Sequence, residues 1–160
     1  RALSPGINDP FTAITCVDHL GAALVELATR RVPSPYRLDE QGRLRVVTNI
    51  STPDGLVDAA FHQIRQAARG NAAVALRLLE VIAEVGRQIL EPSFRAALWR
   101  HAELIANGVR DELPEPADQA EAAERLEQVR TVLKFRRIDE LAWEVGALSG
   151  TPGDVSATPT

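Results

Sequence analysis

The sequence has no methionine, a single cysteine and few aromatic residues, and each shortage limits what the chain can be. The lone Cys16 excludes an intrachain disulfide framework and a zinc site made of several cysteines. Because the chain begins at Arg1 rather than at methionine, we expect it to be a piece of a longer protein. Aromatic residues make up 4% of the chain, so Ala, Leu, Val and Ile must fill the core, which favours close packing of helices.

A surplus of basic charge and a long apolar run are also missing. The formal net charge is -4 and the isoelectric point is near 5.4, which argues against nucleic-acid binding. No apolar run approaches the roughly 18–20 residues of a membrane span, and no signal peptide is visible. With 160 residues, 45% of them apolar, we expect one soluble globular domain that does not itself insert into a membrane.

Capping residues followed by proline mark where the first two helices begin. Asp9-Pro10 predicts a helix to about Arg30, and Thr52-Pro53 predicts a second helix to Arg69. Gly70 fits the left-handed position after a helix, and Asn71 can cap the next one. The turn between helices two and three is then very short, which predicts an antiparallel pair. The first helix carries apolar residues at helical spacing: Ala13, Cys16, Leu20, Leu24 and Leu27.

Further helices follow in the second half. A third, at about 72–90, is apolar over more than half its circumference and is the expected central helix. A fourth begins at Pro92 and ends before Pro114, and a fifth begins near Asp118. At 134–137 the apolar pattern slips by about two positions, which indicates either a kink or a separate final helix.

The fold class predicted is mainly α, an antiparallel bundle of five or six helices with one small β-hairpin at about 36–48. The hairpin is predicted from alternating apolar residues on either side of a turn at 39–42, and we expect it to pack on the helices. We expect residues 1–148 to form the single helical domain, and residues 149–160, rich in Gly, Pro, Ser and Thr, to form a disordered tail.

The side chains that usually carry catalysis show no recognisable arrangement. His19, His62 and His101 fall on different helices without paired spacing, so only tertiary convergence could form a metal site. His101 lies on an apolar stripe, where a hydrogen-bonded core histidine is expected, whereas His62 could be buried or exposed. Cys16 is expected to be an inert buried thiol. We expect no cofactor and no catalytic residues.

The most distinctive polar residues suggest an anion-binding site. Free N–H groups at the start of the first helix and arginines at the end of the second could together bind a small anion. The candidate ligand-binding residues are Ser4, Asn8, Asp9, Arg65, Arg69 and Asn71. The competing interpretation is that Asp9 and Asn71 are caps and that the arginines pair with acids. A second cluster, at 134–137 with Trp143 nearby, could touch a membrane surface, but interleaved acids favour an exposed helix face.

The run Arg1-Ala2-Leu3-Ser4-Pro5-Gly6-Ile7-Asn8-Asp9-Pro10-Phe11-Thr12-Ala13 resembles the signature of an uncharacterised bacterial family of predicted membrane proteins. The stretches 33–44 and 64–79 resemble the same family, and the resemblance covers about 1–113. It implies a parent protein in the bacterial inner membrane, with this chain as its soluble C-terminal domain on the cytoplasmic side and its own transmembrane region as a partner. It implies no reaction, cofactor or catalytic residue.

Three hypotheses about function follow. The leading one is a non-catalytic regulatory or assembly domain of a bacterial membrane protein, with homo-oligomers possible and the fifth helix as the surplus surface. The alternative is a domain that senses a small anion or metabolite near Asp9, Arg65 and Arg69. The most distant is an enzyme assisted by a metal bound through His62 or His101.

Overall fold

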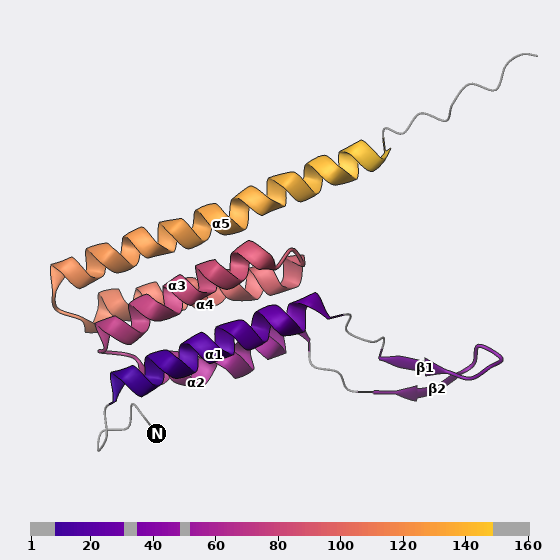
Figure 1. Cartoon of the computed structure of the whole chain (residues 1–160), viewed down its shortest axis with the longest axis horizontal. Coiled ribbons are helices and arrows are strands. Elements are labelled where there is room, and N and C mark those ends of the chain that lie inside the picture. Colours follow the sequence, from indigo (N-terminus) through magenta and orange to yellow (C-terminus); the bar gives the residue numbers. More distant parts are fainter. Residues whose placement is uncertain (1–8, 31–34, 49–51, 149–160) are drawn as a thin grey trace, which may run out of the picture.

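The computed structural model describes residues 9–30, 35–48 and 52–148, with side chains as far as residue 134. Five helices and one hairpin follow each other along these residues, and successive helices alternate in direction (Figure 1). The mainly α bundle with a small hairpin is therefore confirmed. In chain order the elements are α1 (Pro10–Thr29), β1 (Tyr36–Leu38), β2 (Leu44–Val47), α2 (Pro53–Ala67), α3 (Ala72–Gln88), α4 (Pro92–Glu112) and α5 (Pro116–Leu148).

Local hydrogen bonds explain where α1 and α3 begin. The Asp9 carboxylate accepts from the N–H groups of Phe11 and Thr12, at 3.1 and 3.2 Å, so the first turn of α1 is capped. The Asn71 side chain accepts from Val74 N–H at the start of α3, directly after Gly70, whose φ is 76°. Both capping predictions are confirmed.

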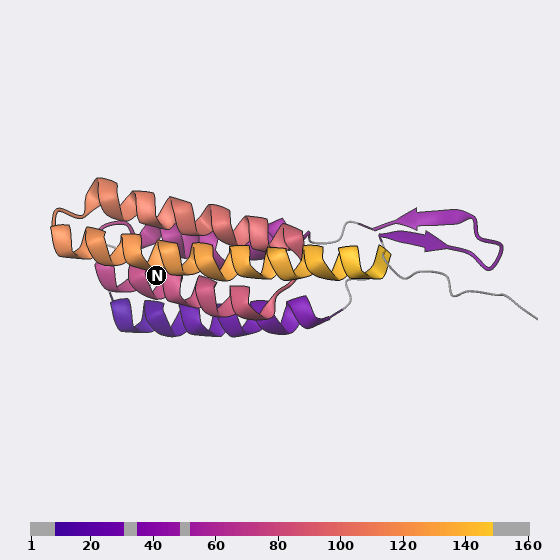
Figure 2. The ribbon, with the colours of Figure 1, turned by 90° about the horizontal axis from the view of Figure 1, so that it is seen from above.

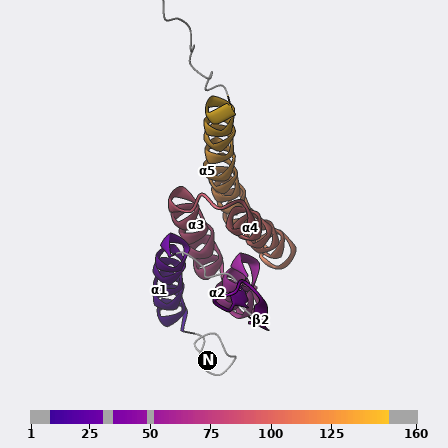
Figure 3. The same cartoon turned by 90° about the vertical axis from the view of Figure 1, so that its right-hand side faces the viewer.

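The helices pack in two rows, and α3 lies in the middle of one of them. Viewed along the bundle, α1, α3 and α5 follow one another, and α2 and α4 close the other side (Figure 3). α3 packs against α1, α4 and α5, while α2 packs against α1 and α4. The predicted antiparallel pair of α2 and α3 is confirmed: the two helices run in opposite directions across a short turn, and the core lies between them.

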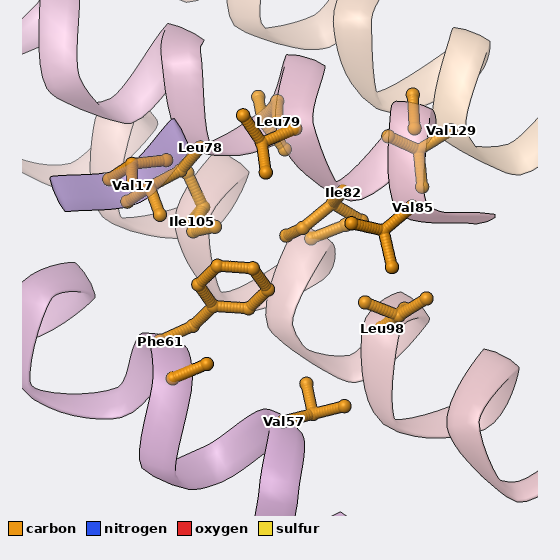
Figure 4. Packing of buried hydrophobic residues seen from close by; sticks show 14 of the residues in the cluster. Val17, Val57, Phe61, Leu78, Leu79, Ile82, Val85, Leu98, Ile105 and Val129 are labelled. Atoms are coloured by element: carbon orange, nitrogen blue, oxygen red, sulfur yellow. The ribbon is translucent and has the colours of Figure 1, made fainter. Parts of the chain in front are cut away.

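Aliphatic side chains fill that core. Phe61 of α2 lies opposite α3 with Ile105 of α4 nearby, and Val57 of α2 lies close to Leu98 of α4 (Figure 4). α3 contributes the largest share of buried residues, so it is the central helix, as predicted. The largest apolar side chains that are fully buried are Phe61, Leu78, Leu79, Ile82, Leu98, Val17, Val57, Val74, Val81, Val85 and Val129.

The hairpin extends away from the end of the bundle (Figures 1 and 2). All seven residues of β1 and β2 are exposed, so the expectation that the hairpin packs on the helices was wrong. An apolar ribbon is therefore left in contact with solvent, which is unusual for a two-stranded hairpin.

α1 lies at the edge of the bundle and buries a narrow stripe of Ala13, Val17, Gly21 and Leu24. Cys16 lies off this stripe and is exposed, so the prediction of a buried thiol was wrong. The expectation that no segment could span a membrane also needs correction. By length and composition α1 could do so, with a mean hydropathy of 1.4. Its apolar character is spread among small residues rather than gathered in one run, which is why the sequence did not reveal it.

α5 is one continuous helix of 33 residues, so the alternative of a separate sixth helix does not apply. Its C-terminal part continues past the ends of α3 and α4 (Figures 1 and 2). Leu133 is buried, and Lys134, the last residue with a described side chain, is exposed. The slip in the apolar pattern thus falls close to where the helix leaves the bundle.

Candidate functional site

A row of polar side chains runs between α2 and α4 and forms the candidate site. We call it the α2–α4 polar seam. Residues spaced three or four apart on a helix share a face, so α2 presents an acidic end, then Phe61, then a basic end. The members are Asp54, Asp58, Arg65 and Arg69 from α2 and its C-terminal end, and Arg100, His101 and Glu112 from α4.

His101 is the most buried member of the seam. Its side chain is fully enclosed, and its Nε2 lies 2.7 Å from Asp58 Oδ1. The ring also meets Phe61 edge to face, with centroids 6.1 Å apart. Burial lowers the pKa of His101 more than the Asp58 hydrogen bond raises it, so the neutral ring donates Nε2–H to the carboxylate. The predicted hydrogen-bonded core histidine is confirmed.

Arg100 completes the acidic end of the seam. It donates from Nη2 to Asp58 at 3.0 Å and to Asp54 at 3.2 Å. The hydrogen bonds from His101 and Arg100 lower the pKa of Asp58 against the opposing effect of burial, so this carboxylate stays ionised at neutral pH. Arg100 therefore pairs with both carboxylates at the acidic end of the seam.

Arg65, at the basic end, has no carboxylate partner among the described residues. Its side chain is 8% exposed, and its Nε has no hydrogen-bond acceptor in the described part of the chain. Burial lowers the pKa of Arg65, and the nearby positive charges of Arg69 and Arg100 lower it further, with Asp58 opposing. A buried cation without a partner is costly, because desolvation is not offset by pairing.

Arg69 is exposed and pairs with Glu112 of α4 at 3.2 Å. Arg65, Arg69 and Gly70 line a small pocket between the C-terminal ends of α2 and α4 and the first turns of α3. Its cavity volume is about 10 Å³, room for about one water-sized group. Apolar side chains, including Leu78, Ile105 and Val109, form the rest of the wall.

The structure brings together only part of the predicted ligand site. Arg65 and Arg69 line one pocket, and Asn71 follows directly after its Gly70. Asp9 does not line this pocket, and its carboxylate accepts hydrogen bonds within the first turn of α1. Ser4 and Asn8 lie outside the described residues. The competing interpretation therefore holds for Asp9, Asn71 and Arg69, but no acid in the described part of the chain pairs with Arg65.

Four seam residues were missed in the sequence: Asp54, Asp58, Arg100 and Glu112. Each lies more than forty residues from its partner across the seam. The available signal was the spacing of Asp54 and Asp58, which places two acids on the same face of α2 as Arg65. Nothing local could have identified the partners on α4.

The other histidines show no metal site. His62 is exposed, with Nε2 3.2 Å from the Gln66 side-chain nitrogen, and His19 Nδ1 donates to the Thr15 carbonyl at 2.7 Å. Within the described ranges, no group of three His, Cys, Asp or Glu side chains is placed to hold a metal ion.

A larger groove, with a volume of about 430 Å³, lies between α1 and α3. Its central charge is Arg77, which contacts Asp18 at 2.7 Å, Glu80 at 2.8 Å and Glu84 at 3.2 Å. These acids raise the pKa of Arg77. Because that guanidinium is already surrounded by carboxylates, it is not free to bind an anion.

Comparison with known proteins identifies a family for this chain, but it does not indicate a reaction. Residues 1–84 match the family described as "Predicted membrane protein (DUF2254)". The chain is 32% identical over 120 residues to "Uncharacterized protein Rv1290c" of Mycobacterium tuberculosis (strain ATCC 25618 / H37Rv) and to "Uncharacterized protein Mb1321c" of Mycobacterium bovis. Each match covers 75% of this chain and 23% of the relative, so the chain spans about a quarter of these relatives' length. No solved structure matches.

Proposed function

Because this chain belongs to the predicted membrane protein family DUF2254, we propose that it is a non-catalytic assembly domain through which copies of a bacterial inner-membrane protein associate. The observation that carries the proposal is the exposed apolar face of the hairpin. A soluble domain rarely leaves an apolar surface uncovered unless that surface meets a partner.

The pairing of the strands places four large apolar side chains on one face. Tyr36 pairs with Val47, and Leu38 pairs with Leu44, because a bulge between Arg37 and Leu38 shifts the register. Paired residues share a face, and Tyr36 and Leu38 share one because they are two apart in β1. Tyr36, Leu38, Leu44 and Val47 therefore form the hairpin face, and each is between 53% and 62% exposed.

The occupant that fits this face best is the same face of a second copy. Two hairpins that pack face to face about a two-fold axis would cover both apolar surfaces at once. Near the turn, Arg45 donates to Asp39 at 2.8 Å within the hairpin, so these two opposite charges are already paired. Association through the hairpin also leaves the helical bundle unchanged.

The test is size-exclusion chromatography with light scattering on this chain at several concentrations, for the wild type and for Leu38→Ser. We expect a concentration-dependent dimer for the wild type. In a symmetric dimer the substitution removes a leucine from both copies, so its dissociation constant should rise by roughly thirtyfold or more. Helix content by circular dichroism should not change, because Leu38 contributes nothing to the bundle core.

Phe11→Ser is the matched control, because Phe11 is a large apolar residue on α1 that is 82% exposed. It should leave the dimer intact. A wild type that stays monomeric at every concentration would refute the assembly proposal. If Phe11→Ser dissociates the dimer and Leu38→Ser does not, the interface lies on α1 and the hairpin has no part in it.

A further inference from the structure

Among the described residues, two arginines are buried in the bundle, and they differ in how their guanidinium groups are satisfied. Arg95 is 6% exposed and donates to the backbone carbonyl groups of Gly86, Ile89, Val132 and Leu133. Arg65 is buried to a similar extent, yet it has no hydrogen bond or ion pair among the described residues. Buried polar groups in native proteins are normally hydrogen-bonded, so an exception calls for a specific explanation.

From this contrast we propose that the pocket at Arg65 binds the phosphate group of a small anion, with Arg65 and Arg69 as its ligands. The proposal does not depend on association through the hairpin. One phosphate oxygen would lie in the pocket beside Arg65, because the cavity of about 10 Å³ has room for a single such group. The remaining oxygens would face the exposed side chain of Arg69 at the mouth.

The charges around the pocket favour an oxyanion. Arg100 forms ion pairs with both Asp54 and Asp58, and Glu112 forms an ion pair with Arg69. No described carboxylate therefore pairs with Arg65. A guanidinium offers N–H donors in a planar fork, which matches phosphate oxygens better than a spherical halide. The first turn of α3 begins beside Gly70 and adds partial positive charge. The carboxylate of Glu112 and the C-terminal ends of α2 and α4 oppose an anion, so the two arginines must outweigh them.

Gly108 keeps the pocket open from the α4 side. A Cβ atom added there would have no other atom within 4 Å, although Gly108 lies in the interior of a helix and lines the pocket. Alanine is the better helix former by about 1 kcal/mol. The substitution Gly108→Ala should therefore be tolerated by the fold while it narrows the pocket.

The experiment is chemical unfolding of the 160-residue chain with inorganic phosphate as the probe, at an ionic strength held constant with sodium chloride. If phosphate binds the folded state alone, the unfolding equilibrium constant should fall about tenfold at a phosphate concentration ten times the dissociation constant. The variants are Arg65→Met and Gly108→Ala, with Arg110→Met as the control. Arg110 is exposed on the same end of α4, but it does not line the pocket.

We expect the phosphate effect to disappear in Arg65→Met and to weaken in Gly108→Ala, and to persist in Arg110→Met. Amide resonances of Gly70 and Gly108 should shift on titration of the wild type, while that of Gly42 in the hairpin turn should not. Stabilisation that chloride reproduces, or that survives in Arg65→Met, would overturn the proposal. So would unchanged resonances of both pocket glycines, even if Arg65→Met fails to fold.

Discussion

The close contact between α1 and α3 at Gly21 gives the sharpest test of the packing. A Cβ atom at Gly21 would lie 2.3 Å from Val81 Cγ1 and 3.6 Å from Val85 Cγ2. Carbon atoms in contact prefer separations of about 3.5–4.0 Å, so the first distance is too short by more than an ångström. We therefore predict that Gly21→Ala destabilises the bundle.

Two opposing effects set the size of this change. Alanine favours the helix by about 1 kcal/mol relative to glycine, whereas overpacking a core typically costs about 1–3 kcal/mol. The higher part of that range applies here, because Val81 is 2% exposed and a valine in a helix has essentially one χ1 rotamer. Its methyl group cannot swing aside, so the two helices must separate. We expect a net loss of about 1–2 kcal/mol, or roughly 3–6 °C in Tm.

Gly108→Ala is the matched control, because its added Cβ meets no other atom within 4 Å. It should stabilise the chain by about 0.5–1 kcal/mol, so that the two variants lie about 1.5–3 kcal/mol apart. Urea unfolding followed by circular dichroism at 222 nm, in phosphate-free buffer, measures both. Equal stability of the two variants, with unchanged dependence on urea, would refute the packing of α1 on α3 described above.

Two further predictions concern the buried polar groups. Burial lowers the pKa of His101, and an unfolded histidine has a pKa of about 6.5, so the unfolded chain binds more protons below that pH. The free energy of unfolding should therefore fall as the pH drops below about 6.5, by at most about 1.4 kcal/mol per pH unit. Urea midpoints measured between pH 7 and pH 5 check this, and the His101→Gln variant should not show the fall. If His101→Gln shows the same pH dependence as the wild type, another group titrates. Arg95→Met should cost roughly 2–4 kcal/mol, because the carbonyl groups of Ile89 and Val132 lose their donor. Hydrogen exchange should then quicken in α5, and a variant with wild-type protection there would contradict the role of Arg95 in holding α5.

The helix starts could be predicted from sequence because their causes are local. Asp9, Thr52 and Asn71 each accept a hydrogen bond from an N–H group two or three residues ahead. Capping of this kind needs no distant partner. The short turn at Gly70 follows for the same reason, since its positive φ suits glycine.

The buried face of α1 could not be predicted, because that helix is apolar on most sides. The structure buries the stripe that contains Gly21 and leaves Cys16 exposed. The choice depends on how closely α3 approaches, which is a property of both helices together. The hairpin presents the same difficulty, since its alternating pattern predicts the strands but not what covers them.

In the candidate site, too, one part could be predicted from the sequence and another part could not. Arg65 and Arg69 are one turn apart, so the sequence could place them near each other. Whether each one pairs with an acid depends on α4, which supplies Glu112 to Arg69 and supplies Arg100 to compete for Asp58. Pairing over more than forty residues is decided by the packing of the helices and not by spacing.

Local and tertiary signals agree through most of the described residues, and they disagree most clearly at two places. An apolar hairpin face is left in solvent, and Arg65 is buried without a partner among the described residues. Such disagreements are expected where a protein meets a partner or a ligand. The two places lie at opposite ends of α2, because β2 leads into its first turn and the pocket at Arg65 adjoins its last. Leu38→Ser should therefore leave phosphate binding intact, and Arg65→Met should leave association intact, so failure of one proposal would not remove the other.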